Sequence, residues 1–304
     1  MSVKLSIGTW AYTFDDNSKQ LFSIEDLAFR LGKLGFDGVA LSGFKPQAHY
    51  ELYSTKKARR QLEDLFNSNG LEINCYAADL KDYPFYTGIK DEINNYEEAF
   101  DRCLELCVDC EIPVIRIDTV AAAPYSGDFD YSAIWDRVVE MFKKNARKAG
   151  KSGKMVVWEF EPGFIFNKPS EILKMVKDVG MDNFKLQYDT CHAQMCAVAG
   201  TNHYGEKEVL KGGQLELLEI LKGMIGDVHL IDSDNTLRDI RNSTHAPFGK
   251  GLIDFEKLIP AFERAGYTSE WWTIDIGARS DAWELTEHSI KYLDVLFKKL
   301  DMKK

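Results

Sequence analysis

The sequence has little of what marks a nucleic-acid-binding or membrane protein. Its 38 Lys and Arg are outnumbered by 48 Asp and Glu, and the formal net charge of -10 argues against a basic surface for nucleic acid. It has no apolar run near the roughly 20 residues that a membrane span needs. Residues 1–12 lead straight into a strand-like run without a signal-peptide pattern. We therefore expect a cytoplasmic protein with a small-molecule substrate, no nucleic-acid partner and no membrane.

Cysteine is also scarce, because six residues in 304 are too few for a disulfide scaffold. Cys103, Cys107 and Cys110 have the C-x3-C-x2-C spacing that some iron–sulfur enzymes use. The same spacing, i, i+4 and i+7, places all three thiols on one face of a helix. We expect a buried helix face here rather than a cluster.

Nucleotide-binding glycine motifs are absent: no G-x-G-x-x-G follows the first strand-like run, and there is no P-loop. Strand-like and helix-like segments instead alternate from end to end. Strands are expected at 4–9, 38–41, 72–76, 114–118, 155–159, 184–189, 226–231 and 271–275, and helices at 23–34, 56–68, 94–110, 131–149, 168–179, 214–222, 255–265 and 282–300. This pattern predicts an α/β protein, a single (β/α)8 TIM barrel formed by residues 1–304. A doubly wound sheet is the alternative, although it usually has fewer units.

Four acidic or imidazole residues stand near the ends of the last four predicted strands. They are Glu159, Asp189, His229 and Asp275. Alternation along each strand lets all four side chains point into the barrel, where the carboxyl ends of parallel strands converge. Each residue alone could instead cap a neighbouring helix or meet solvent, and for Glu159 or Asp275 taken singly that interpretation is favoured. Their repetition on four consecutive strands favours a shared divalent-metal site, because carboxylates and imidazole are suitable ligands.

Two neighbouring residues are candidates for proton transfer. Glu161 has the same parity as Glu159 and competes with it as a ligand. Pro162 should end strand pairing just after Glu161, so we expect Glu159 to be the ligand and Glu161 a supporting group or a general base. His192, three residues after Asp189, is the best-placed imidazole for proton transfer, with helix capping as the alternative.

Four further residues are candidates for substrate binding. Arg116 shares parity with Asp118, so it either pairs with Asp118 or contacts the substrate. Lys168 stands in the loop after the fifth strand, where it either meets an anionic group or is simply exposed. His245 lies in a long loop after the seventh strand and either binds substrate or is solvated. Trp10 follows the first strand, at the predicted mouth of the barrel.

Other aromatic residues flank the same mouth. They are Tyr12 and Phe14 after the first strand, and Phe164 and Phe166 after the fifth. Aromatic rings at a barrel mouth either stack on the apolar face of a sugar and exclude water, or pack between loops.

Several motifs carry a family resemblance. They are WEFEPG at 158–163, DTCH at 189–192, VHLID at 228–232 and FGKGLID at 248–254. With these motifs, nearly the whole chain resembles the xylose isomerase-like TIM barrel superfamily of sugar phosphate isomerases and epimerases, which also includes endonuclease IV. The resemblance implies one divalent ion held by Glu159, Asp189, His229 and Asp275, with Mn2+ expected first and Mg2+, Co2+ or Zn2+ as alternatives. It also implies that His192 contacts substrate oxygens.

The chain departs from the family pattern in three places. Asp275 stands where Glu is common, so its reach is one methylene shorter. Ala40 stands where the second strand often ends in Glu. The segment 246–251 reads APFGKG where P-G-x-G is common. Its six histidines and acidic charge argue against the endonuclease branch, which uses more His ligands and several metal ions.

The resemblance implies a metal-dependent isomerase or epimerase acting on a ketose or keto-sugar. A proton next to a metal-bound carbonyl would be removed, forming an enediolate. The alternative is a lyase with the same site, either a keto-inositol dehydratase or a C-glycoside deglycosidase acting on a 3-keto sugar. The deglycosidase would have a small partner subunit, and a homo-oligomer is compatible with either reading. A non-catalytic sugar-binding barrel would predict a damaged ligand set, and DNA repair would predict a basic groove.

Overall fold

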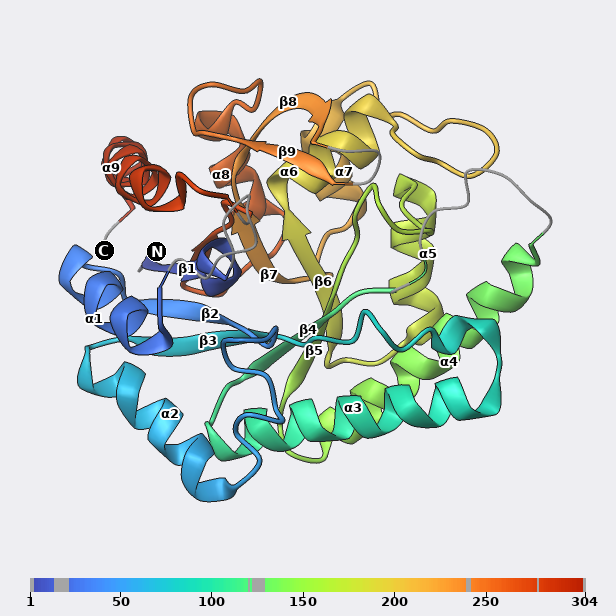
Figure 1. The fold of residues 1–304 in the computed structure, drawn as a ribbon. Coiled ribbons are helices and arrows are strands. Elements are labelled where there is room, and N and C mark those ends of the chain that lie inside the picture. Colours follow the sequence, from blue (N-terminus) through green and yellow to red (C-terminus); the bar gives the residue numbers. More distant parts are fainter. Residues whose placement is uncertain are drawn as a thin grey trace.

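Eight parallel strands close into a barrel in the order β1-β10-β7-β6-β5-β4-β3-β2 (Figure 1). The computed structural model describes residues 3–13, 22–119, 121, 129–238, 242–277 and 279–302. The barrel strands are β1 (Lys4–Gly8), β2 (Gly38–Ser42), β3 (Glu72–Ala77), β4 (Val114–Ile117), β5 (Met155–Glu159), β6 (Phe184–Asp189), β7 (Ile225–Leu230) and β10 (Trp271–Ile274). Because β1 pairs with both β2 and β10, the sheet is closed. The (β/α)8 TIM barrel is confirmed, and the doubly wound alternative is wrong.

A helix follows each barrel strand and packs on the outside of the barrel (Figure 1). These helices are α1 (Ile24–Leu34), α2 (Lys56–Ser68), α3 (Lys90–Asp109), α4 (Tyr131–Gly150), α5 (Pro169–Val179), α7 (Gly213–Ile220), α8 (Phe255–Arg264) and α9 (Ala282–Lys299). Side-chain caps begin several of them, for example at α1, where Ser23 Oγ accepts from Asp26 N at 3.1 Å. The largest difference from expectation is α3, which begins four residues earlier, with Asp91 and Glu92 in its first turn.

Two segments between β6 and β10 hold structure that the sequence patterns miss. The polar stretch after β6 begins with α6 (Thr190–Ala193) and a π-helical turn, η3 (Gln194–Ala199). The predicted loop after β7 contains an antiparallel hairpin, β8 (Asp232–Leu237) and β9 (Ser243–Ala246). The hairpin packs against α6 over one end of the barrel (Figure 1).

One carboxylate anchors the base of the hairpin to the FGKG segment. Asp232 accepts hydrogen bonds from the backbone N–H groups of Gly249, Gly251 and Ile253 at 2.9–3.1 Å. A Cβ at position 251 would lie 2.2 Å from Asp232 Oδ1, so this position requires glycine. The FGKG motif therefore has a structural role beside the family resemblance it carries.

The inside of the barrel is polar below the strand ends. Ser6 Oγ and Thr273 Oγ1 are 2.8 Å apart, and Asn74 Nδ2 donates to Thr273 Oγ1 at 3.3 Å. Gln187 Nε2 donates to Asp227 Oδ2 at 3.0 Å. All five side chains are buried. The barrel interior beneath the strand ends therefore contains a layer of hydrogen-bonded polar side chains.

The apolar core lies between the barrel and its helices. Cys103, Cys107 and Cys110 are buried in this layer as free thiols, which confirms the helix-face interpretation. Of the residues that the structure describes, no cysteine belongs to a metal-capable group. None of the helices in the described ranges combines the length and apolar character that crossing a membrane requires.

Candidate active site

The structure brings the four predicted ligands together at one end of the barrel. Glu159 and Asp189 end β5 and β6, His229 lies on β7 directly beside Asp189, and Asp275 follows β10. All four side chains are buried, and one potential ligand atom from each lies within 4.8 Å of the others. Parallel strands in register place these side chains at one level, as the strand-end pattern predicts.

Glu159 and Asp189 each have one carboxylate oxygen held by the protein. Glu159 Oε2 forms an ion pair with Arg116, and Asp189 Oδ1 accepts the backbone N–H of His192 at 2.8 Å. Their other oxygens, Glu159 Oε1 and Asp189 Oδ2, are buried and have no hydrogen-bond partner among the described residues. In both residues, one carboxylate oxygen is therefore bound by the protein and the other is left to bind a cation.

Asp275 follows the same rule. Its Oδ1 accepts two hydrogen bonds at 2.9 Å, one from Trp10 Nε1 and one from the backbone N–H of Gly277. Its Oδ2 lies 3.2 Å from His229 Nδ1, and Glu159 Oε1 lies 3.2 Å from the same nitrogen. Three carboxylates thus each direct one oxygen toward a common space around His229.

These residues fit a divalent cation. A buried polar atom without a partner costs about 1–3 kcal/mol, and here several such atoms from one cluster converge. Oxygen donors with one imidazole nitrogen suit Mn2+, Mg2+ and similar ions. Glu161 is absent from this group of four described residues and falls in another with Glu159 and His192. The geometry therefore favours Glu159 as the ligand.

The packed charges shift the pKa values of these groups in opposite directions. Burial and neighbouring carboxylates raise the pKa of Asp189 well above its usual range. Burial acts to raise the pKa of Glu159 as well, but Arg116 and His229 outweigh it and lower that pKa to about 2. Burial opposes charge on His229, yet the carboxylates of Asp275 and Glu159, each 3.2 Å from its Nδ1, outweigh burial and raise its pKa.

His192 is a buried, neutral imidazole at the start of α6. Burial lowers its pKa to about 3. Its Nδ1 is 2.9 Å from Ser243 Oγ on β9, and its Nε2 is 3.8 Å from Glu161 Oε2. The hairpin therefore orients the ring. No pattern in the sequence indicates this contact, because the polar sequence of β8 does not predict a strand.

His245 lies on β9 rather than in an irregular loop, and it is partly buried. Its Nδ1 is 3.0 Å from the carbonyl oxygen of Ser243, and its ring packs edge-on against His192 with centroids 5.2 Å apart. Arg279 donates to the His245 carbonyl oxygen at 3.3 Å. The solvated-loop alternative for His245 is wrong.

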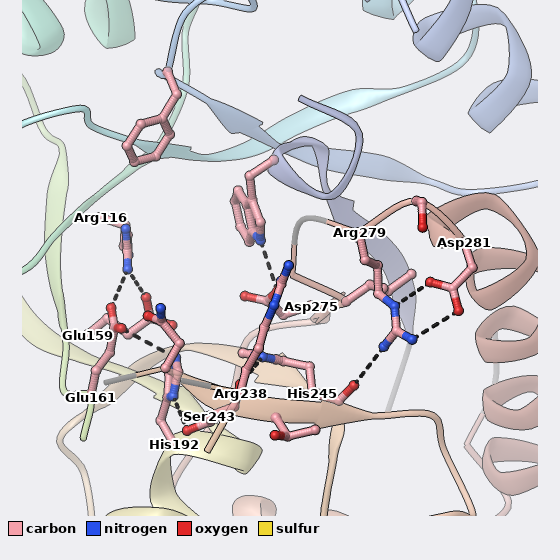
Figure 2. A pocket seen from close by; sticks show the side chains of 16 residues that line it. Arg116, Glu159, Glu161, His192, Arg238, Ser243, His245, Asp275, Arg279 and Asp281 are labelled. Atoms are coloured by element: carbon pink, nitrogen blue, oxygen red, sulfur yellow. Dashed lines mark hydrogen bonds and ion pairs between the residues drawn. The ribbon is translucent and has the colours of Figure 1, made fainter. Parts of the chain in front are cut away.

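Arg116 makes its closest contacts with two glutamates rather than with Asp118. Its guanidinium forms ion pairs with Glu159 and, at 2.8 Å, with Glu161 (Figure 2). The carboxylate of Asp118 is farther away, at 3.8 Å. Burial and the neighbouring Glu159 raise the pKa of Glu161 well above its usual range. Arg116 therefore contacts Glu159 and Glu161 together, and the raised pKa favours a protonated Glu161.

A cavity of about 830 Å3 opens over these residues. Trp10, Arg116, His192 and His245 line it, whereas Lys168 caps α5 and is not among the described lining residues. Several other lining side chains carry no individual signal in the sequence, although they lie in the segments after β2, β7 and β10, where barrel enzymes build their sites. These are Phe44, Arg238, Asn242, Ser243, Arg279 and Asp281 (Figure 2).

The remaining aromatic residues take different places. Tyr12 and Phe166 are fully buried, so they pack between elements instead of facing a substrate. Phe164 is partly buried and is not among the described lining residues of the cavity. Phe14 lies outside the described residues.

A closed (β/α)8 barrel with acidic and imidazole side chains gathered at its strand ends defines a class of barrels with a candidate metal centre. The chain belongs to the xylose isomerase-like TIM barrel family, whose model matches residues 30–296. A search of curated proteins finds no significant match.

Solved structures share the fold at low sequence identity. A D-tagatose 3-epimerase-like protein superposes with a TM-score of 0.72 at 18% identity, covering 98% of this chain and all of its own. A D-psicose 3-epimerase gives a TM-score of 0.72 at 16% identity, with 97% and 98% coverage. A probable 3-DHS dehydratase from Bacillus anthracis gives 0.68 at 16% identity, with 96% and 99% coverage. At these identities the likeness shows the fold.

Proposed function

We propose that this protein is a divalent-metal-dependent isomerase or epimerase of a ketose or keto-sugar. The observation that carries the proposal is the convergence of three buried carboxylates and one imidazole, several with unpartnered atoms, beside Glu161 and His192. Neighbours of the same fold include proteins named as sugar 3-epimerases, which supports the same substrate class.

The four converging residues, Glu159, Asp189, His229 and Asp275, would hold the ion. Mn2+ is the first candidate, and Mg2+, Co2+ or Zn2+ are alternatives. A bound divalent ion supplies Lewis-acid stabilisation of the negative charge that develops on a carbonyl oxygen when the neighbouring carbon loses a proton.

Glu161 and His192 would handle the proton. Arg116 holds Glu161 Oε1, which leaves Oε2 to accept and return a proton on the cavity side. His192 is neutral, and with Nδ1 facing Ser243 its Nε2 is directed toward Glu161. From that position Nε2 would orient a substrate hydroxyl. Both residues line the cavity, where exclusion of water strengthens such contacts.

Three further lining residues would form the substrate-binding wall. These are Trp10, Arg116 and His245. Lys168 has no role in this proposal, because it caps the start of α5 and is not among the described residues that line the cavity.

A lyase is the second candidate. The same deprotonation next to a carbonyl can expel a substituent from the following carbon, as a dehydratase does. A probable dehydratase shares the fold over nearly its full length, which supports a lyase as the second candidate. The keto-inositol dehydratase and 3-keto-sugar deglycosidase readings both belong to this outcome.

One experiment separates these functions. The purified Mn2+ form is incubated with a panel of keto-sugars in D2O and followed by NMR. Deuterium at the carbon next to the carbonyl without loss of a group indicates an isomerase or epimerase, whereas release of a leaving group indicates a lyase. No exchange with any keto-sugar would contradict both.

The metal site is tested on the same preparation. Asp189→Ala should lose bound metal and activity together, because it removes a ligand. Asp182→Ala, an exposed aspartate before β6, serves as the matched control and should change neither. Unchanged metal content in Asp189→Ala would overturn the ligand assignment.

A further inference from the structure

Trp10 has a second set of contacts besides the cavity. It stands on η1 (Thr9–Tyr12), the 3-10 turn directly after β1. Its indole ring lies beside the ring of His229, with centroids 5.2 Å apart, and its Nε1–H donates to Asp275 Oδ1 at 2.9 Å. A residue of the first strand's loop therefore touches two of the four candidate ligands.

The contact with Asp275 bears on the shorter reach of that acid. An aspartate carries its carboxylate one methylene less far from the backbone than a glutamate would. Trp10 and Gly277 both donate to the same oxygen, Oδ1, and leave Oδ2 on the side of His229. Two donors on one oxygen fix the rotation of the carboxylate about its Cβ–Cγ bond.

We propose that Trp10 is a positioning residue that holds Asp275 in the orientation required to bind the metal. This inference rests on the proposed metal-dependent function and adds to it a residue that acts through a ligand. Groups that orient metal ligands typically change metal affinity about 10- to 100-fold when they are removed.

Two glycines support this role. Gly8, the last residue of β1, has φ -68° and ψ 118°, a conformation open to any residue. A Cβ there would nevertheless lie 2.2 Å from Cζ2 of the Trp10 indole, so glycine is needed to admit the ring. Gly277 has φ +70°, the left-handed conformation that favours glycine, and this turn places its N–H on Asp275. The chain thus makes room for the indole and adds a second donor.

The test measures metal binding without substrate. Metal-stripped protein is titrated with Mn2+ by calorimetry as wild type and as Trp10→Phe, which keeps a ring and removes the N–H. We expect the Kd for Mn2+ to rise about 10- to 100-fold. Gly8→Ala should raise it in the same direction by displacing the indole. Trp283→Phe is the matched control and should leave it unchanged, because Trp283 Nε1 donates to Glu287 on α9 instead.

A double-mutant cycle separates positioning from general damage. If Trp10 acts through Asp275, then Trp10→Phe should have no further effect on the Kd once Asp275→Ala has removed the acceptor. Equal losses in both backgrounds would overturn the proposal. So would a Trp10→Phe variant with an unchanged Kd and only a raised KM, since that result would assign Trp10 to substrate stacking.

Failure of the proposed function gives a different result. If the wild-type protein itself does not bind Mn2+ or another divalent ion, the metal centre is wrong and the role of Trp10 falls with it. Wild-type binding together with an unaffected Trp10→Phe sinks only the positioning role. Thermal unfolding of the metal-free variants, compared with Trp283→Phe, verifies that each is folded.

Discussion

The four strands that carry the candidate ligands differ from the two strands that flank them. β5, β6, β7 and β10 are consecutive in the barrel, and each contributes one acid or imidazole. β4 and β1 border this run on either side, and each contributes a nitrogen donor to the nearest ligand. Arg116 of β4 holds Glu159, and Trp10 after β1 holds Asp275. The first and last candidate ligands of the run are thus each held by a side chain from a flanking segment, and the flanking strands carry no candidate ligand themselves.

The opposite side of the barrel has neither function. Within the described residues, β2 and β3 add no side chain to the cluster. The candidate metal centre is therefore built on six neighbouring strands: four carry the candidate ligands, and two carry or precede a side chain in contact with one of them. Breaking a support and removing a ligand should give different results.

Removal of the β4 support should have the largest effect on folding. Arg116→Met leaves Glu159 and Glu161 buried without their counter-charge, and breaking a buried ion pair in this way costs about 3–5 kcal/mol. We expect the free energy of unfolding of the metal-free protein to fall by about that amount in urea titrations. An unchanged unfolding midpoint would show that Arg116 is not a support. Arg60→Met, at an exposed pair on α2, is the control.

Removal of a ligand should mainly affect metal binding. Glu159→Gln keeps the shape of the side chain and removes its charge, so the Kd for Mn2+ should rise by more than about 100-fold, beyond the usual effect of a supporting residue. Calorimetric titration measures this directly. A rise smaller than that of Trp10→Phe would reverse the roles assigned to ligand and support.

The metal site should be sensitive to pH in a defined direction. His229 and Asp189 have raised pKa values in the metal-free protein, and both must lose protons to bind an ion. Mn2+ affinity should therefore fall as the pH is lowered, and binding of the ion should release protons. Titrations in buffers of different ionisation enthalpy count these protons. Affinity that does not change with pH would mean that neither group is a ligand.

The smallest effect is expected from the hairpin. Ser243→Ala removes the hydroxyl beside His192 Nδ1. Loss of one such hydrogen bond costs about 0.5–1.5 kcal/mol, which corresponds to a decrease of about 2- to 12-fold in kcat/KM. Metal affinity should stay constant, because Ser243 contacts none of the four candidate ligands directly. Thr236→Ala, farther along the hairpin and exposed, should leave kcat/KM unchanged.

The sequence pattern was sufficient to predict the barrel and the convergence of Glu159, Asp189, His229 and Asp275. Both depend on local regularities, the alternation of side chains along a strand and the spacing of strands and helices. The single-domain reading, the identity of the metal and the roles of these residues stay predictions.

Other parts of the site depend on contacts between distant residues and could not be predicted in this way. The hairpin strand β8 has the polar sequence DSDNTL and is exposed along much of its length, so it lacks the apolar alternation of a strand. The contacts of Arg116 with two glutamates require β4 and β5 to be placed side by side. Gly8 looks unremarkable until the indole of Trp10 is seen packed against it.

The anchoring of Asp232 has a consequence for how the cavity can diversify. This carboxylate fastens the base of the hairpin to the segment before α8, and Ser243 keeps its position beside His192. Arg238 and Asn242, which line the cavity, lie farther from that base. The rim can therefore change in length and side chains while the fastening below it stays fixed. Under the proposed function, substrate choice could therefore change without altering the groups that transfer the proton.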